Sequence, residues 1–207
     1  MDEPKWLLWA RELQAIAQTG LAFSKDQYDL ERYRRLRAIA VEMLAEGSGA
    51  PIERIAALFD RESGYATPKV DVRGAVFRDN RILLVRETGD GRWTLPGGWA
   101  DVNQSPRESV EREIEEESGF TARAYKLVGV WDYRRQGHGA RHAHSIYKLF
   151  FLCELTGGSA RPSPETSAVE FFALDRLPEL SFGRVNPDQL RRMYQHRDNP
   201  QLQTEFD

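Results

Sequence analysis

Apolar residues recur every three or four positions through the first third of the chain. In residues 6–18 this spacing predicts an amphipathic helix that ends at Gly20. A second helix is predicted over residues 28–46, followed by the glycine-rich stretch 47–50. Pro51 suits the first turn of a short third helix. We therefore expect a small all-α N-terminal domain over residues 1–66.

From Val70 onward the pattern changes to short apolar runs. Residues 70–77 and 81–87 read as two strands of a hairpin, and strand-like runs return at 125–133, 145–155 and 168–174. Helical patterns occupy the stretch after Ser105 and residues 187–196. Strands that enclose a helix predict an α/β fold with a mixed sheet. We assign this domain to residues 67–207.

Composition and charge exclude several classes of protein. The 207 residues carry a formal net charge of −3, so no basic surplus marks a footprint for duplex DNA. The start of the chain lacks the basic and small-residue features of a signal peptide, and no apolar run approaches the roughly 20 residues of a membrane span. Cys153 has no partner cysteine and lies in an apolar run, which indicates a buried thiol. We expect a cytoplasmic protein with no membrane association.

The helix after Ser105 is unusually rich in glutamate. Ser105, Pro106 and Glu108 form the pattern of a helix start with a capping box, and Gly119 marks the end. At about 100° per residue, one group of carboxylates gathers beside the buried stripe and the other faces solvent. The first group is Glu113, Glu116 and Glu117, and the second is Glu108, Glu111 and Glu115.

Three neighbouring carboxylates repel one another unless a cation neutralises them. Oxygen ligands of this kind suit Mg²⁺ or Mn²⁺. The alternative is a surface helix with ordinary ion pairs, in which Arg112 joins Glu116 four residues later. The stretch "TLPGGW" favours the metal, because a loop with two glycines lets backbone carbonyls approach a ligand.

Residues 98–120 resemble the signature of the Nudix hydrolases. Gly98 opens the family signature, and the second half of that signature is matched in register by Arg112, Glu113, Ile114, Glu116, Glu117, Gly119 and Phe120. Gln104 stands where the family has its first glutamate, a partner of the motif's arginine. The resemblance implies an α/β/α sandwich, and Gln104 implies weaker electrostatics around Arg112.

The resemblance extends to the N-terminal helices. They are similar to a Nudix subgroup with a helical N-terminal domain, which includes CDP-choline pyrophosphatases and homologues labelled ADP-ribose pyrophosphatases. It implies cleavage of a nucleoside diphosphate linked to a group X, with CDP-choline favoured over ADP-ribose or a nucleotide sugar. RNA ends are a possible side substrate, and a nucleotide sensor without turnover is the alternative of another class. Apolar helix faces carrying Trp6, Trp9 and Leu13 fit a dimer interface or packing within the chain, and we expect a homodimer.

The resemblance also implies roles for single residues. Glu113, Glu116, Glu117 and the Gly97 carbonyl are expected to hold the metal ions, with Glu116 and Glu117 essential for turnover. The base that activates water is expected to be Glu165, with Glu170 or an acid of the signature as alternatives.

Substrate contacts are less sharply indicated by the sequence. Arg86 can meet a phosphate, Asp132 can bond a base edge, and Trp99 can stack on a base. Core packing for Trp99 and a surface ion pair for Arg86 are the competing interpretations. Loop 134–144 holds three histidines and three arginines. We expect a solvated loop; a cationic rim for phosphate or RNA ends is the first alternative. A zinc site is the second, because the histidine spacing matches a zinc motif only loosely.

Overall fold

The computed structural model describes residues 4–138 and 142–207, and within it the chain forms two compact units. One unit is Met1–Pro68 with Arg141–Ser145, and the other is Lys69–Ala140 with Ile146–Asp207. None of the helices in the described ranges is both long and apolar enough to cross a membrane.

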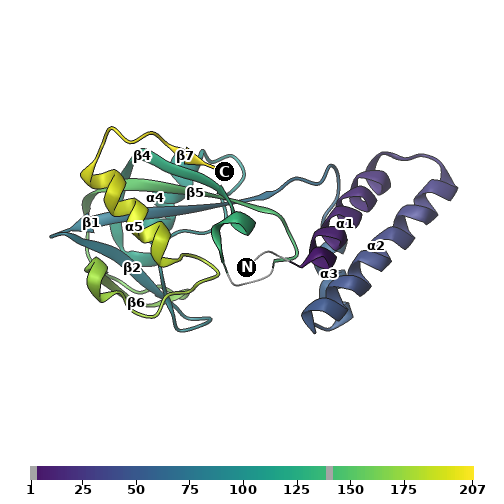
Figure 1. Ribbon diagram of the computed structural model, residues 1–207, viewed down its shortest axis with the longest axis horizontal. Helices are drawn as coiled ribbons and strands as arrows, with labels where there is room; N and C mark the ends of the chain where they lie inside the picture. Colours follow the sequence, from purple (N-terminus) through teal and green to yellow (C-terminus); the bar gives the residue numbers. More distant parts are fainter. Residues whose placement is uncertain (1–3, 139–141) are drawn as a thin grey trace. The chain divides into compact units, whose positions relative to one another are not determined.

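The first unit is an antiparallel helix pair with a short third helix. Its elements are α1 (Lys5–Phe23), α2 (Gln27–Ser48) and α3 (Ile52–Asp60), seen in purple and blue in Figure 1. The Asp26 side chain caps α2 by accepting the N–H of Asp29. The core of this unit consists of Leu7, Ala10, Val41, Leu44, Ile55 and Phe59.

Gly20 does not end the first helix, so that prediction is wrong. Helix α1 continues through Gly20 to Phe23. A Cβ atom on Gly20 would lie 2.4 Å from the ring of Tyr33 in α2. The glycine therefore serves the close approach of two helices, a tertiary requirement that the local sequence does not reveal.

The second unit is built on a mixed sheet, as predicted. Its strands are β1 (Lys69–Arg78), β2 (Arg81–Glu87), β3 (Trp93–Thr94), β4 (Phe120–Asp132), β5 (Ile146–Gly158), β6 (Thr166–Phe172) and β7 (Glu205–Phe206). The order is β3-β2-β1-β5-β4-β7, with β6 on β2. Strand β1 runs parallel to β5 and antiparallel to β2. Asp79 and Asn80 turn the β1–β2 hairpin with φ of 50° and 58°, a conformation that these residue types tolerate.

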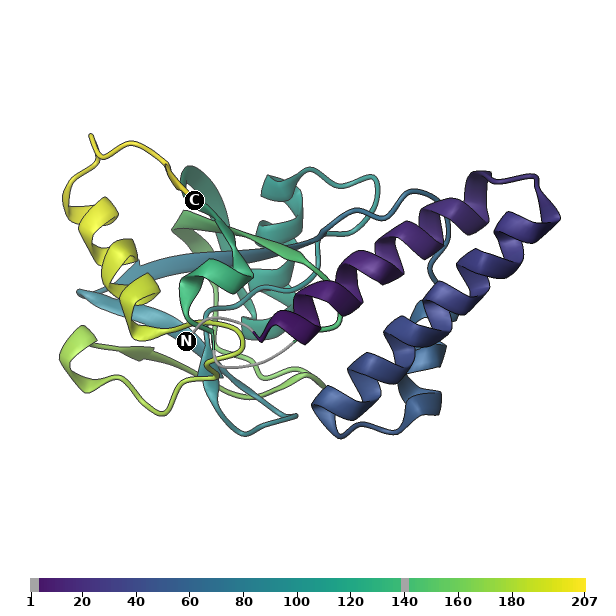
Figure 2. The same ribbon diagram turned by 45° about the vertical axis from the view of Figure 1, so that its right-hand side comes forward.

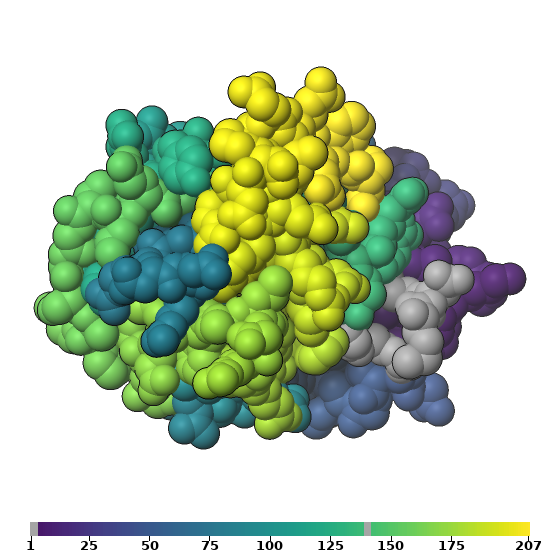
Figure 3. Space-filling model, turned by 60° about the vertical axis from the view of Figure 1, so that its left-hand side comes forward, coloured from purple at the N-terminus to yellow at the C-terminus, as the bar shows by residue number. Residues whose placement is uncertain are grey.

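Helices cover both faces of this sheet. Val110 and Ile114 of α4 (Pro106–Ser118) pack on one face. Leu190 and Met193 of α5 (Pro187–Asp198) pack on the other. Figure 2 shows the sheet between the two helices, and α5 and the C-terminal segment, in yellow, form much of the face in Figure 3. Two short 3₁₀ helices, η1 (Tyr133–Gln136) and η2 (Leu174–Arg176), complete the unit. The predicted α/β/α sandwich is confirmed.

Candidate active site

The start of α4 is fixed by its predicted capping box. The Ser105 hydroxyl accepts the N–H of Glu108 at 3.2 Å, and the Glu108 carboxylate accepts the N–H of Ser105 at 2.8 Å. Pro106 occupies the first turn, and Gly119 ends the helix with φ of 75°. Because both ends are fixed, the rotation of the helix and the direction of its carboxylates are fixed too.

The double-glycine loop lies against β1. The N–H groups of Val72 and Gly74 donate to the carbonyls of Gly98 and Pro96, at 2.8 and 2.9 Å. Gly97 has φ of 142°, and a Cβ there would lie 2.0 Å from the Val72 oxygen, so only glycine fits. Among the described residues nothing donates a hydrogen bond to the Gly97 carbonyl, which leaves that oxygen available to a ligand.

Glu117 is the most buried acid of α4. It is 5% exposed, and one carboxylate oxygen accepts the Gly97 N–H at 2.8 Å. Burial raises the pKa of Glu117 to about 8, and the charges of Glu87 and Glu113 add to this rise, while Arg73 opposes it. A carboxylate that is buried beside other acids needs a nearby cation to stay ionised at neutral pH.

Glu113 and Glu116 differ in their surroundings. The Glu113 carboxylate lies against Gly98, where an added Cβ would be 3.0 Å from its oxygen, and burial raises the pKa of Glu113. The Glu116 side chain is 58% exposed and pairs with Arg112. In the described part of the chain no three acid, histidine or cysteine side chains already form a group that could hold a metal ion.

Arg112 joins the acids at the edge of the site. Its Nη2 lies 2.9 Å from Asp101 and 3.0 Å from Glu113, and its Nε donates to the Gln104 side-chain oxygen at 3.1 Å. The Ser109 hydroxyl donates to the same oxygen of Gln104 at 3.2 Å. Gln104 thus keeps the hydrogen bond of the family's glutamate to the arginine and lacks its charge.

Glu111 departs from the expected solvated face. Its side chain is 28% exposed and accepts the N–H of Ala124 in β4 at 2.8 Å and the Nε of Arg107 at 2.9 Å. The helical wheel placed Glu111 opposite Glu113 correctly, but β4 passes that side of α4 and partly covers the carboxylate.

Three charged side chains are buried at the start of β1 and β5. Asp71 lies 2.8 Å from Arg73 and 2.9 Å from Lys148, and all three residues are at most 6% exposed. Burial acts to raise the pKa of Asp71, but the two cations outweigh it and hold the pKa at about 2. Burial lowers the pKa of Lys148 to about 8. Two cations and one anion leave a net positive charge, which Arg73 extends toward Glu117 and Glu87.

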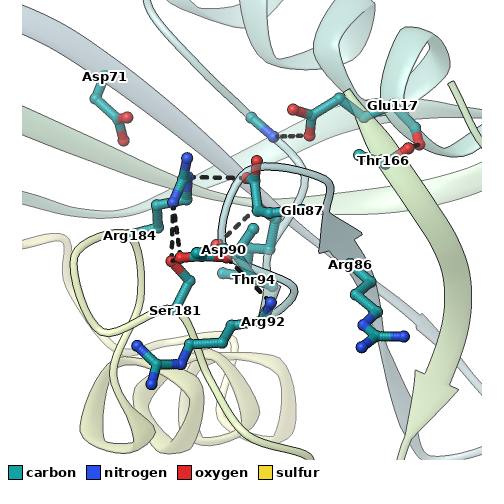
Figure 4. Close-up of polar contacts among 12 residues, drawn as sticks. Asp71, Arg86, Glu87, Asp90, Arg92, Thr94, Glu117, Thr166, Ser181 and Arg184 are labelled. Carbon is teal, nitrogen blue, oxygen red and sulfur yellow. Dashed lines mark hydrogen bonds and ion pairs between the residues drawn. The ribbon is translucent and has the colours of Figure 1, made fainter. Parts of the chain in front are cut away.

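A second polar network connects the end of β2 with the loop before α5. Glu87 is 8% exposed, and Arg184 reaches its carboxylate at 2.9 Å and that of Asp90 at 3.2 Å. The Ser181 hydroxyl donates to Asp90 at 2.7 Å (Figure 4). The sequence does not reveal this network, because Glu87 and Asp90 are separated from Ser181 and Arg184 by more than ninety positions along the chain.

The three residues predicted to contact the substrate, Arg86, Trp99 and Asp132, have different structural surroundings. Arg86 donates to the Gly91 carbonyl at 2.7 Å and points away from Glu117 (Figure 4). Trp99 is 50% exposed, so it is not a core residue, and its backbone bridges to Asp71. Asp132 caps η1 by accepting the Arg134 N–H at 2.9 Å.

Glu165 is exposed on the loop before β6. Its carbonyl accepts the N–H of Thr88 at 2.9 Å, and the hydroxyl of the adjacent Thr166 donates to the Glu117 carbonyl at 2.6 Å. The first bond joins the loop to the residue that follows β2, and the second joins it to the C-terminal turn of α4. Glu170 is exposed within β6, opposite Leu84.

His138 is not part of a solvated loop. Its ring stacks on Tyr133 with centroids 4.5 Å apart, and Nδ1 lies 2.7 Å from the Phe182 carbonyl. Burial lowers the pKa of His138 to about 4. A zinc site of the loop finds no support within the described ranges. Arg141 lies outside the described residues.

Two family profiles cover most of the chain. The profile of the NUDIX domain matches residues 67–194, and a profile described as "UDP-X-like, N-terminal oligomerisation domain" matches residues 4–59. The chain belongs to the Nudix family. The predicted subgroup with a helical N-terminal domain is confirmed as well.

Several relatives match all or part of this chain. A Bacillus subtilis protein named provisionally as an ADP-ribose pyrophosphatase is 46% identical over 99% of this chain and 98% of its own length. The crystal structure of an ADP-ribose pyrophosphatase from Streptococcus suis is 40% identical, with a TM-score of 0.63, over 68% of this chain and 100% of its own. A UDP-X diphosphatase structure is 36% identical, with a TM-score of 0.64, over the whole of both chains. The predicted class, a Nudix pyrophosphatase, is confirmed.

Proposed function

We propose that this Nudix enzyme cleaves the diphosphate of a nucleoside diphosphate linked to a group X, with Mg²⁺ or Mn²⁺ as its cofactor. The products are a nucleoside monophosphate and X-phosphate. The observation that carries the proposal is the position of two carboxylates against the glycine loop: the partly buried Glu113 lies against Gly98, and the buried Glu117 accepts the N–H of Gly97.

The donor set suits a hard divalent cation. Glu113, Glu116 and Glu117 supply carboxylate oxygens, and Gly97 supplies a carbonyl without a hydrogen-bond donor in the described residues. Nudix hydrolases generally use divalent ions. When bound, such ions neutralise the diphosphate's charge and lower the pKa of a bound water.

The chain's own residues orient these ligands. The Gly97 N–H fixes one oxygen of Glu117, and Arg112 holds Glu113 and Glu116 from the other side. We assign to Glu165 the role of taking the proton from the attacking water, because its loop is joined to the Glu117 turn through Thr166. Glu170 and an acid of the signature are the alternatives to Glu165.

The group X follows from the relatives rather than from the site. Two relatives with this helical N-terminal unit are named for ADP-ribose and UDP-X, so these are the first substrates to test. CDP-choline, favoured by subgroup resemblance, stays a prediction. Trp99, exposed beside Gly98, is proposed to stack on the base, and Asp132 to bond its edge. No described contact of Arg86 supports phosphate binding.

The deciding experiment is turnover against a panel of substrates. ADP-ribose, UDP-glucose, CDP-choline, NADH, a dinucleoside polyphosphate and a short RNA are each incubated with Mg²⁺ or Mn²⁺, and a phosphatase releases phosphate from the products. Selective turnover of one substrate identifies X. Absence of turnover on all of them, with nucleotide binding by calorimetry, would replace the enzyme with the nucleotide sensor.

We also propose a homodimer formed through the helical unit. The matching N-terminal profile is described as an oligomerisation domain, and this unit exposes large apolar side chains. They are Trp9, Ile16, Phe23, Tyr28, Ile52, Leu58 and Tyr65. Sedimentation velocity of the full chain tests this, and a clean monomer at micromolar concentration would reject it.

A cytoplasmic location is proposed on the cysteine content. Cys153 is 3% exposed and is a free thiol, and burial raises its pKa, which keeps it unreactive. A fusion to a fluorescent protein found outside the cytoplasm would contradict this location.

A further inference from the structure

The acids of the site leave open which side chain meets the substrate's phosphate. A diphosphate carries negative charge, and an arginine fork is the usual protein group for such oxygens. Arg86 bonds Gly91 on the side away from Glu117 (Figure 4). Arg73 is committed to Asp71 and to the Leu95 carbonyl and is 4% exposed.

Arg184 has a different position. It belongs to the loop before α5, and its guanidinium lies beside the Glu87 carboxylate (Figure 4). Nε is 2.9 Å from Glu87, and Nη1 is 3.2 Å from Asp90 and 2.9 Å from the Ser181 hydroxyl. Glu87 in turn is close enough to Glu117 for its charge to act on that carboxyl group. Glu87 therefore lies between Arg184 and Glu117, an acid of α4.

One edge of the guanidinium is still available. Arginine has five N–H donors, and the contacts of Arg184 use Nε and Nη1. Within the described ranges Nη2 has no hydrogen-bond partner, and the side chain is 37% exposed. The side chain is thus held in place on one edge and open on the other.

We propose that Arg184 binds a phosphate oxygen of the substrate's diphosphate through Nη2, while Glu87 and Asp90 hold its guanidinium in position. The inference rests on the proposed pyrophosphohydrolase function and adds a phosphate-binding residue to it. Because three contacts already order the side chain, little rotamer entropy is lost when the phosphate binds. The charge-assisted bond that forms is worth roughly a 10- to 100-fold gain in affinity.

The test compares Arg184→Gln and Arg184→Lys with the matched control Arg86→Gln. Arg86 is also an exposed arginine near the end of β2, and it faces away from the site. Dissociation constants for ADP-ribose and for inorganic pyrophosphate are measured by calorimetry without metal, and KM and kcat are measured with Mg²⁺. Circular dichroism and thermal unfolding report whether each variant folds.

Arg184→Gln is expected to weaken both ligands and raise KM roughly 10- to 100-fold. Arg184→Lys keeps the charge but loses the planar guanidinium, so its dissociation constants and KM should lie between those of Arg184→Gln and the wild type. For Arg86→Gln these values should stay within about 2-fold of the wild type. Equal affinities of the wild type and a folded Arg184→Gln overturn the proposal, as does a larger loss in Arg86→Gln.

Failure of the proposed function has its own signature. If the wild type turns over no substrate, the enzyme assignment fails, and the calorimetric comparison still decides whether Arg184 contacts phosphate. If the wild type hydrolyses substrate and Arg184→Gln matches it in KM and affinity, the function stands and the role of Arg184 falls.

Discussion

Gly97 donates its backbone N–H to the Glu117 carboxylate at 2.8 Å, across twenty positions of sequence. The bond joins the glycine loop, which runs beside β1, to the last turn of α4. It places the most buried acid of the site next to a carbonyl without a donor in the described residues, so one residue both orients a ligand and offers one.

Gly97→Ala should therefore damage both the fold and the site. The new Cβ would lie 2.0 Å from the Val72 oxygen at a φ of 142°, and we expect a loss of at least about 2 kcal/mol in the free energy of unfolding. Gly89→Ala is the control, because a Cβ there meets no heavy atom within 4 Å. Urea unfolding compares the two, and similar losses would show that the Gly97 conformation is not required.

Glu117→Gln should separate activity from stability. Removing a carboxylate that burial keeps close to neutral costs the fold little, whereas loss of a metal ligand should lower kcat by at least about 100-fold. Glu115→Gln, on the exposed side of α4, is the matched control and should keep wild-type turnover. Near wild-type kcat in Glu117→Gln would remove Glu117 from the metal site.

The limits of α4 and its acids could be predicted because local signals determine them. Ser105, Pro106 and Gly119 mark the helix ends within a few residues of sequence, and the 3.6-residue period then separates Glu117 from Glu115. The same period could not show that β4 covers Glu111, since that depends on the register of a strand far along the chain.

Residues whose interaction partners lie far away in the chain could not be predicted from the sequence. Arg184 lies 2.9 Å from Glu87, and Lys148 lies 2.9 Å from Asp71. The local sequence around either cation does not indicate its partner, because Glu87 and Asp71 belong to β2 and β1. At Gly20 a local signal gave a wrong prediction. Glycine often ends a helix, but here it lies within α1 and allows close packing against Tyr33. The residue roles implied by the Nudix resemblance were tied mainly to the signature and to a few nearby positions, and Arg184, Glu87, Lys148 and Asp71 lie outside that set.

Gln104→Glu restores the family's charge and should strengthen the Arg112 network modestly. Arg112 is 27% exposed and already pairs with Asp101, Glu113 and Glu116, so we expect a gain below about 1 kcal/mol that fades in high salt. Gln104→Ala should lose about 1 kcal/mol, because the Nε of Arg112 and the Ser109 hydroxyl lose their acceptor. Thermal unfolding at low and high salt measures both, and a destabilised Gln104→Glu would mean that the acids there already repel.

The network around His138 predicts how stability depends on pH. The capping box of α5 directs the Gln189 side-chain oxygen to the Asn186 N–H, so the Gln189 amide nitrogen faces Nε2 of His138 at 3.1 Å. The ring then accepts at Nε2 and donates at Nδ1 to the Phe182 carbonyl. Protonation at Nε2 would set a donor against a donor, which agrees in direction with the pKa of about 4 that burial produces.

Because the folded pKa of His138 lies below its ordinary value of 6.5, the unfolded chain binds the proton first as the pH falls. The stabilising contribution of neutral His138 is complete above pH 6.5 and is lost as the pH falls toward 4. At 1.36 kcal/mol per pKa unit, about 2 kcal/mol should disappear between pH 7.5 and pH 5. Urea unfolding of the wild type and His138→Asn at both pH values measures this, since all other titrating groups are shared. The difference between the two proteins should shrink by that amount at pH 5, and a constant difference would mean that His138 titrates normally in the folded state.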